Sequence, residues 1–154
     1  MTARGTTASR VIVALTLALG ACGRKSPPIA PELVRPEPAE QLGAVVVPEG
    51  VRLTWLRPMR YSGGARMNDL GGFTIERAPG EGAPVEFEPV GTLPVEDQTR
   101  FRKERRLEWI DHSAEPGRRY LYRVTAFTLD GYRSTPAGPV AIRFGPEAPP
   151  AKEQ

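Results

Sequence analysis

Short segments of strictly alternating apolar and polar residues constrain this chain more than any other feature. The alternation is regular in "VRLTW" at 51–55, "FTIER" at 73–77, "YLYRVTA" at 120–126 and "PVAIRF" at 139–144. Because successive side chains on a β-strand point to opposite faces, each segment predicts a strand with one apolar face. In the third segment Arg123 and Thr125 are expected to face solvent. The side chains expected to face the core are Tyr120, Tyr122, Val124 and Ala126.

Three further segments bring the expected number of strands to about seven: "AVVV" at 44–47, "FEPVGTL" at 87–93 and "LEWID" at 107–111. Turn residues separate the segments, and 16 Gly with 17 Pro favour turns and extended chain over helix. The 154 residues are therefore expected to form an all-β protein with one antiparallel sandwich.

The N-terminus has a different pattern. Arg4 and Arg10 precede the apolar run "VIVALTLALGA" at 11–21. A membrane-spanning helix needs about 20 residues, so this run of 11 predicts a signal peptide over residues 1–21, with a buried helix as the alternative.

The residues Leu19-Gly20-Ala21-Cys22 resemble the lipobox of bacterial lipoproteins, and Cys22 is the only cysteine in the chain. The resemblance implies that the chain is cut before Cys22 and that acyl chains are attached to its sulfur and its new amino group. Several acyl chains together anchor a protein durably, so a membrane is an expected partner. A free buried thiol is the alternative. Gly23 in place of Asp favours the outer membrane, by the sorting pattern of enteric bacterial lipoproteins.

Residues 22–42 are predicted to form a spacer, because prolines exclude helix and favour polyproline II; they are Pro27, Pro28, Pro31, Pro36 and Pro38. At about 3.1 Å per residue, residues 23–41 extend up to about 60 Å. The start "CGRKSPP" is similar to that of small envelope lipoproteins beginning Cys-Gly-x-Lys-Gly-Pro. The tail, residues 146–154, is expected to be disordered.

The segment "PGRRYLYRVTA" at 116–126 resembles the Pro-Gly-x-x-Tyr-x-Tyr-x-Val-x-Ala pattern of fibronectin type III domains. The resemblance implies a fibronectin type III or immunoglobulin-like β-sandwich over residues 43–145, with Trp55 in the core and Trp109 where the family often has Tyr. It places Tyr120 at a tyrosine corner, where the hydroxyl bonds to upstream backbone. Tyr120→Phe is therefore expected to cost about 1 to 3 kcal/mol, and Tyr122→Phe less. The connection at 57–72 is longer than most members have.

The sequence offers little for catalysis. One Cys and one His, His112, cannot supply a Cys/His zinc site. "DHS" at 111–113 holds the residue types of a hydrolase triad, but neighbours on a strand point to opposite faces. "GGFTIERAPGEG" at 71–82 matches no phosphate-binding pattern. We therefore expect no enzyme activity, no cofactor and no metal site.

A basic run at 100–106 is the sharpest charged feature; its cations are Arg100, Arg102, Lys103, Arg105 and Arg106. It is suited to phosphate, as in lipopolysaccharide or a lipid headgroup. A solvated loop is the interpretation we favour. Nucleic acid is not expected as a partner behind a signal peptide, and the formal net charge is only +3.

These features predict a membrane-anchored lipoprotein of the bacterial cell envelope, facing the periplasm or the cell surface. Its sandwich domain is expected to bind or scaffold an envelope protein. One alternative is a glycan- or lipopolysaccharide-binding accessory. The other is an outer-membrane assembly factor, which only "CGRKSPP" suggests.

Overall fold

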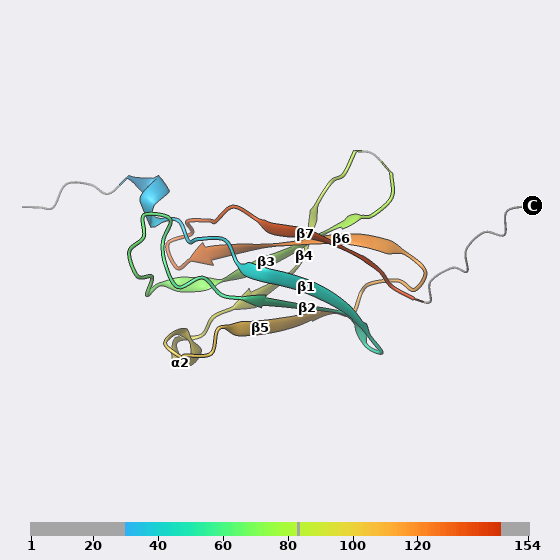
Figure 1. Cartoon of the computed structure of the whole chain (residues 1–154), viewed down its shortest axis with the longest axis horizontal. Coiled ribbons are helices and arrows are strands. Elements are labelled where there is room, and N and C mark those ends of the chain that lie inside the picture. Colours follow the sequence, from blue (N-terminus) through green and yellow to red (C-terminus); the bar gives the residue numbers. More distant parts are fainter. Residues whose placement is uncertain (1–29, 83, 146–154) are drawn as a thin grey trace, which may run out of the picture.

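The computed structural model describes residues 30–82 and 84–145, which form a sandwich of two antiparallel sheets (Figure 1). The three-stranded sheet has the order β1 (Glu40–Val47), β2 (Gly50–Leu56), β5 (Arg106–Asp111). The four-stranded sheet has the order β4 (Glu88–Pro94), β3 (Leu70–Pro79), β6 (Arg119–Thr128), β7 (Ala137–Arg143). Two short helical turns accompany them, η2 (Pro31–Val34) and α2 (Asp97–Arg100). The expected all-β sandwich is confirmed, and each predicted segment lies in a strand.

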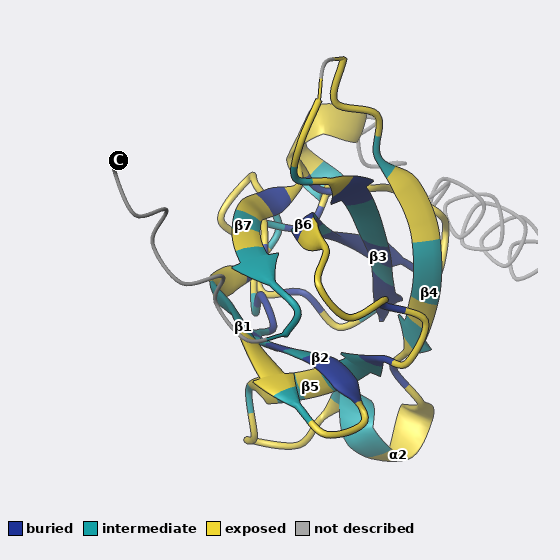
Figure 2. Ribbon diagram, turned by 90° about the vertical axis from the view of Figure 1, so that its right-hand side faces the viewer, coloured by how far each residue is buried: buried dark blue, intermediate teal, exposed yellow. Residues whose placement is uncertain are grey.

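The core lies between the two sheets, where the buried residues of facing strands meet (Figure 2). Trp55 of β2 is fully buried and packs edge-on against Phe73 of β3, with ring centroids 5.4 Å apart. The four residues of β6 expected to face the core are all buried, as the alternation predicted. In β2 and β6 the buried face therefore follows the period-two pattern of the sequence.

Thr125 departs from its expected exposure. It lies on the outer face of β6, yet only 4% of its surface is exposed. Glu76 covers this position because Arg123 holds the Glu76 carboxylate with two hydrogen bonds of 2.9 and 3.0 Å, and Thr125 donates to it at 3.3 Å. An outward residue is thus buried under a charged pair from the same sheet.

The ordered domain begins before residue 43. β1 starts at Glu40, and both Pro36 and Ala39 are buried. Pro36 pairs with Tyr61 in the β2–β3 connection, and the backbone N–H of Gly63 donates to the carbonyl of Leu33 at 3.1 Å. The described part of the expected spacer therefore packs against the domain. The signal peptide at 1–21, Cys22 and the tail at 146–154 lie outside the described residues.

The two ends of the sandwich are built from different connections. We call the proximal end the one formed by η2, the β2–β3 connection (57–69), the β4–β5 connection with α2 (95–105) and the β6–β7 turn (129–136) (Figure 1). The distal end carries the β1–β2, β3–β4 and β5–β6 connections. Within the described residues, no helix is long and apolar enough to cross a membrane.

Candidate functional site

The β5–β6 connection carries the tyrosine corner that the sequence implies. Tyr120 is buried, and its hydroxyl accepts a hydrogen bond of 3.0 Å from the backbone N–H of Glu115. The guanidinium of Arg77 lies over the Tyr120 ring, 4.8 Å from its centroid. Tyr120 therefore fixes the turn between the two sheets.

Asp111 is the centre of a buried polar network that the sequence did not reveal. Only 1% of the Asp111 surface is exposed. Its carboxylate accepts hydrogen bonds from the hydroxyls of Tyr122 and Ser113, each at 2.7 Å. Arg77 forms an ion pair with it at 2.7 Å. Burial raises the pKa of Asp111, but the hydrogen bonds from Ser113 and Tyr122 and the charge of Arg77 outweigh it, so the pKa lies below its ordinary value.

This network bears on the expected ranking of the two tyrosines. Tyr122 is fully buried and its hydroxyl donates to a charged carboxylate, whereas the Tyr120 hydroxyl accepts from a backbone group in an exposed turn. Hydrogen bonds to charged groups contribute more than neutral ones. The geometry therefore favours the opposite ranking, in which Tyr122→Phe costs more than Tyr120→Phe.

The "DHS" residues do not assemble a triad. His112 is exposed, and its Nδ1 lies 3.0 Å from the carbonyl oxygen of Glu49, away from the Asp111 carboxylate. Ser113 bonds Asp111 directly. No cluster of three His, Cys, Asp or Glu side chains among residues 30–82 and 84–145 is placed to hold a metal ion.

The two tryptophans have different positions. Trp55 lies at the centre of the core, as expected. Trp109 of β5 is half-buried at the edge of the core, where its ring lies against Gly91 of β4. It therefore closes the gap between the β4 and β5 edges of the two sheets.

The cations of the basic segment at 100–106 fall into two groups, those held by carboxylates of the domain and those exposed to solvent. Only 11% of the Arg100 side chain is exposed, because it pairs with Asp97 at 2.5 Å and donates to the carbonyl of Leu70 at 3.1 Å. Arg105 pairs with Glu40 at 3.0 Å. Arg102, Lys103 and Arg106 are exposed.

Sequence reasoning missed Arg57, which orders this segment. Its side chain is buried, with 3% of the residue exposed, and it donates to the carbonyls of Thr99 and Arg102. Burial, together with the charge of Arg105, lowers the pKa of Arg57. A buried arginine in a long connection leaves no periodic signal in the sequence, so only its charge was visible there.

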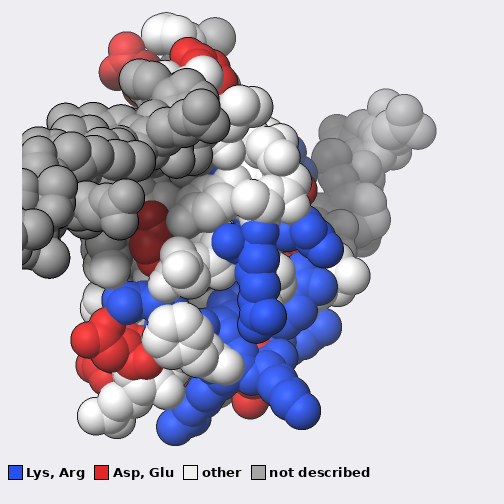
Figure 3. Space-filling view, turned by 90° about the vertical axis from the view of Figure 1, so that its left-hand side faces the viewer, with Lys and Arg blue, Asp and Glu red and all other residues white. Residues whose placement is uncertain are grey.

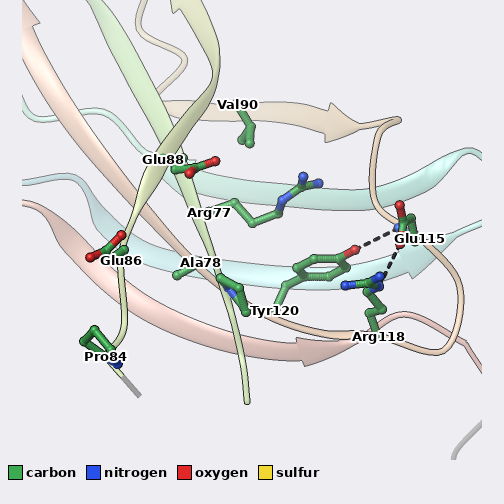
Figure 4. A pocket seen from close by; sticks show the side chains of 10 residues that line it. Arg77, Ala78, Pro84, Glu86, Glu88, Val90, Glu115, Arg118 and Tyr120 are labelled. Carbon is green, nitrogen blue, oxygen red and sulfur yellow. Dashed lines mark hydrogen bonds and ion pairs between the residues drawn. The ribbon is translucent and has the colours of Figure 1, made fainter. Parts of the chain in front are cut away.

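Two surface cavities lie at opposite ends of the sandwich. The edge cavity, of about 400 Å³, lies between β4 and β5, with Leu93, Val95 and Leu107 beside Arg102 and Arg106. The corner cavity, of about 460 Å³, lies beside the tyrosine corner at the distal end (Figure 4). Its lining includes Arg77, Glu86, Glu88, Val90, Arg118 and Tyr120.

The corner cavity presents both signs of charge around an aromatic ring. Figure 4 shows Glu86 and Glu88 along one side, with Arg77 and Tyr120 beside them and Arg118 at the far end. Arg118 pairs with Glu115 at 2.7 Å. This lining suits a polar polypeptide segment better than an apolar small molecule.

No family model matches the sequence, and no curated protein is detectably similar to it in sequence. Solved structures are similar in fold. The third fibronectin III domain of the human KIAA0343 protein has a TM-score of 0.51 at 12% identity, covering 85% of this chain and 100% of that one. A solution structure described as the fourth FNIII domain of a human protein has a TM-score of 0.52 at 15% identity, covering 88% of this chain and 98% of that one. The described domain has the fibronectin type III fold.

A larger protein contains a similar domain. The twitchin kinase region from C. elegans has a TM-score of 0.53 at 20% identity, covering 73% of this chain. The chain spans only 17% of the length of that structure. The fibronectin type III fold hosts many unrelated functions, so these similarities establish architecture, and function must be argued from the surface.

Proposed function

We propose that this protein is a lipid-anchored lipoprotein of the bacterial cell envelope whose fibronectin type III domain binds an envelope protein. The observation that carries the proposal is the position of the corner cavity. It lies at the distal end, whereas the segment leading from Cys22 joins the domain through η2 at the proximal end. A domain tethered in this way presents the corner cavity away from the membrane.

The chemistry of the corner cavity supports a polypeptide partner. Its carboxylates and guanidinium groups can pair with charged side chains of either sign, and the buried Tyr120 lines it beside Val90. Arg77 is already held by Asp111, so its position is fixed before a partner binds. Preorganised side chains lose less conformational entropy on binding.

Site-specific photo-crosslinking in intact envelopes tests this proposal. A photoreactive residue at the exposed position Glu86, on the rim of the corner cavity, is expected to give a discrete protein adduct. The same residue at Glu108, exposed on β5, is the matched control and is expected to give none. Adding Arg118→Glu is expected to weaken the adduct at least several-fold.

Two results would contradict the proposal. If position 86 and position 108 give the same adducts, the corner cavity has no specific partner. If position 86 captures only glycan, the protein belongs to the alternative class of glycan- or lipopolysaccharide-binding accessories.

A further inference from the structure

The exposed apolar side chains of the domain are concentrated at the proximal end. Of the seven large hydrophobic residues exposed in the described part of the chain, four lie there: Leu33, Phe101, Leu129 and Tyr132. Phe101 is the most exposed of them, at 72%, and it follows α2 directly between two arginines. Solvent-exposed apolar side chains gathered on one face mark an interaction surface.

The same end carries exposed cations from all four of its segments: Arg35, Arg60, Arg66, Arg102, Lys103 and Arg133. Within residues 30–82 and 84–145, none of these six forms an ion pair. At the distal end Arg118 pairs with Glu115 and Arg143 with Glu81, and among its described residues Arg119 is exposed without an ion pair. The proximal cations are therefore available to an external anion.

Figure 3 shows this end face-on, with Lys and Arg side chains running across its centre and the main acidic group to one side. The exposed carboxylates of the proximal segments are Glu32, Glu96, Asp97, Glu104 and Asp130. Asp97 is engaged by Arg100. Lys and Arg side chains therefore gather on this end although the net charge of the whole chain is small.

We propose that the proximal end lies on the headgroups of an anionic phospholipid membrane, the one in which Cys22 is anchored; this inference rests on the proposed function above. Cations with interleaved apolar side chains suit a membrane interface, where the cations meet phosphate and the apolar groups enter the acyl boundary. Seven residues lie between Cys22 and Ala30, which allows a reach of at most about 28 Å between the two. The short tether keeps this end at the bilayer.

Quenching of a fluorophore by a lipid with a nitroxide-labelled headgroup tests this contact on the full lipidated protein in vesicles. A fluorophore is attached to a cysteine introduced by Ser62→Cys, exposed at the proximal end. Val46→Cys, exposed near the β1–β2 connection at the distal end, is the matched control. The vesicles contain phosphatidylcholine with or without phosphatidylglycerol, and a nitroxide-headgroup lipid is the quencher.

The label at position 62 is expected to lose most of its fluorescence in phosphatidylglycerol vesicles at 0.1 M salt. The loss is expected to reverse at 1 M salt, because the screening length falls from about 10 Å to about 3 Å. The label at position 46 stays bright throughout. Combining Arg66→Glu with Lys103→Glu is expected to remove at least half of the quenching, whereas Arg119→Glu with Arg143→Glu leaves it unchanged.

Equal quenching at position 62 in neutral and anionic vesicles would overturn the inference, because the tether alone would then account for proximity. Absence of quenching in vesicle-bound protein would also overturn it. Failure of the proposed lipid anchor is recognised by a different result, because protein without an anchor dissociates from the vesicles at 1 M salt. Such protein would still show charge-dependent quenching at 0.1 M salt if the proximal end binds headgroups.

Discussion

Asp111 shows how single buried groups hold this domain together. Its carboxylate accepts hydrogen bonds from Tyr122 of β6, Arg77 of β3 and Ser113 of the following turn. Asp111 itself belongs to β5, so these bonds join the two sheets. A buried carboxylate is stable only when its charge is compensated and its oxygens are hydrogen-bonded. Asp111 meets both conditions.

Removing the Tyr122 hydroxyl is therefore expected to destabilise the domain more than removing that of Tyr120. Tyr122→Phe takes a donor from a buried charged carboxylate and should cost about 2 to 3 kcal/mol. Tyr120→Phe frees a backbone N–H in an exposed turn, where water can replace the hydroxyl, and should cost about 1 kcal/mol. Denaturant titration of both variants measures the difference. A larger loss for Tyr120→Phe would show that the corner matters more than the Asp111 network.

The lowered pKa of Asp111 predicts acid sensitivity. A carboxyl group whose pKa is lower in the folded state stabilises the fold fully above its unfolded pKa of about 3.9. That contribution is lost as the pH falls below about 4 toward the folded pKa. Unfolding free energy measured from pH 7 to pH 2 should therefore fall more steeply in the wild type than in Asp111→Asn. Equal slopes would remove Asp111 as a cause; Glu76, whose pKa is also lowered, mainly by its hydrogen bond with Arg123, contributes the remainder.

At the scale of single residues, the sequence identified those fixed by local pattern. Trp55 and Tyr120 stand in segments that resemble a known domain, and both are buried where that resemblance implies. The partner of Tyr122 is 11 residues away, and the Arg77 partner of Asp111 is 34 residues away. No spacing rule links such residues before the sheets are paired.

At the scale of elements, the β4–β5 connection depends on one buried arginine. Arg57→Ala would remove the side-chain donor to the carbonyl of Arg102 and one of the donors to the carbonyl of Thr99, and is expected to cost about 2 to 3 kcal/mol. Lys103→Ala on the same segment is exposed and should change stability by no more than about 0.5 kcal/mol.

Hydrogen exchange provides the local readout for this prediction. In Arg57→Ala, the amide of Arg100, bonded to Glu96, and that of Arg102, bonded to Thr99, should exchange faster than in the wild type. Unchanged exchange at both amides, with unchanged stability, would mean that α2 holds its shape without Arg57.

Strands were more predictable than connections. Period-two alternation located β2, β3, β6 and β7, and three further apolar segments located the remaining strands. The prolines of residues 22–42 predict an extended spacer, but Pro36 packs into the domain. Proline fixes φ in free polyproline II and in packed extended chain alike, so composition cannot separate the two.

The basic run was difficult to interpret for a related reason. A loop has no periodicity, so nothing in the sequence separates the tied Arg100 from the free Arg102. Nor does the sequence show that Arg60 and Arg66, some forty residues earlier, share the same end of the domain. Arg102, Lys103 and Arg106 are exposed, and the proximal surface also includes cations from other segments of the chain.

At the scale of the whole molecule, the two ends have different chemistry. The proximal end carries several unpaired cations and exposed apolar side chains, and the distal end carries the corner cavity, where Arg77 and Arg118 are paired and Glu86 and Glu88 line the rim. Both proposals assign a role to this polarity: the proximal end meets the membrane, and the distal end meets a protein partner. Both orientations follow from an anchor attached ahead of η2.

Mass spectrometry of the mature N-terminus tests that anchor most directly. The account predicts a first residue Cys22 that carries acyl chains on its sulfur and its amino group, with residues 1–21 removed. Cys22→Ala should leave the signal peptide in place and abolish lipid attachment. An intact Met1 in the wild-type protein, or a mature chain with an unmodified Cys22, would contradict the account.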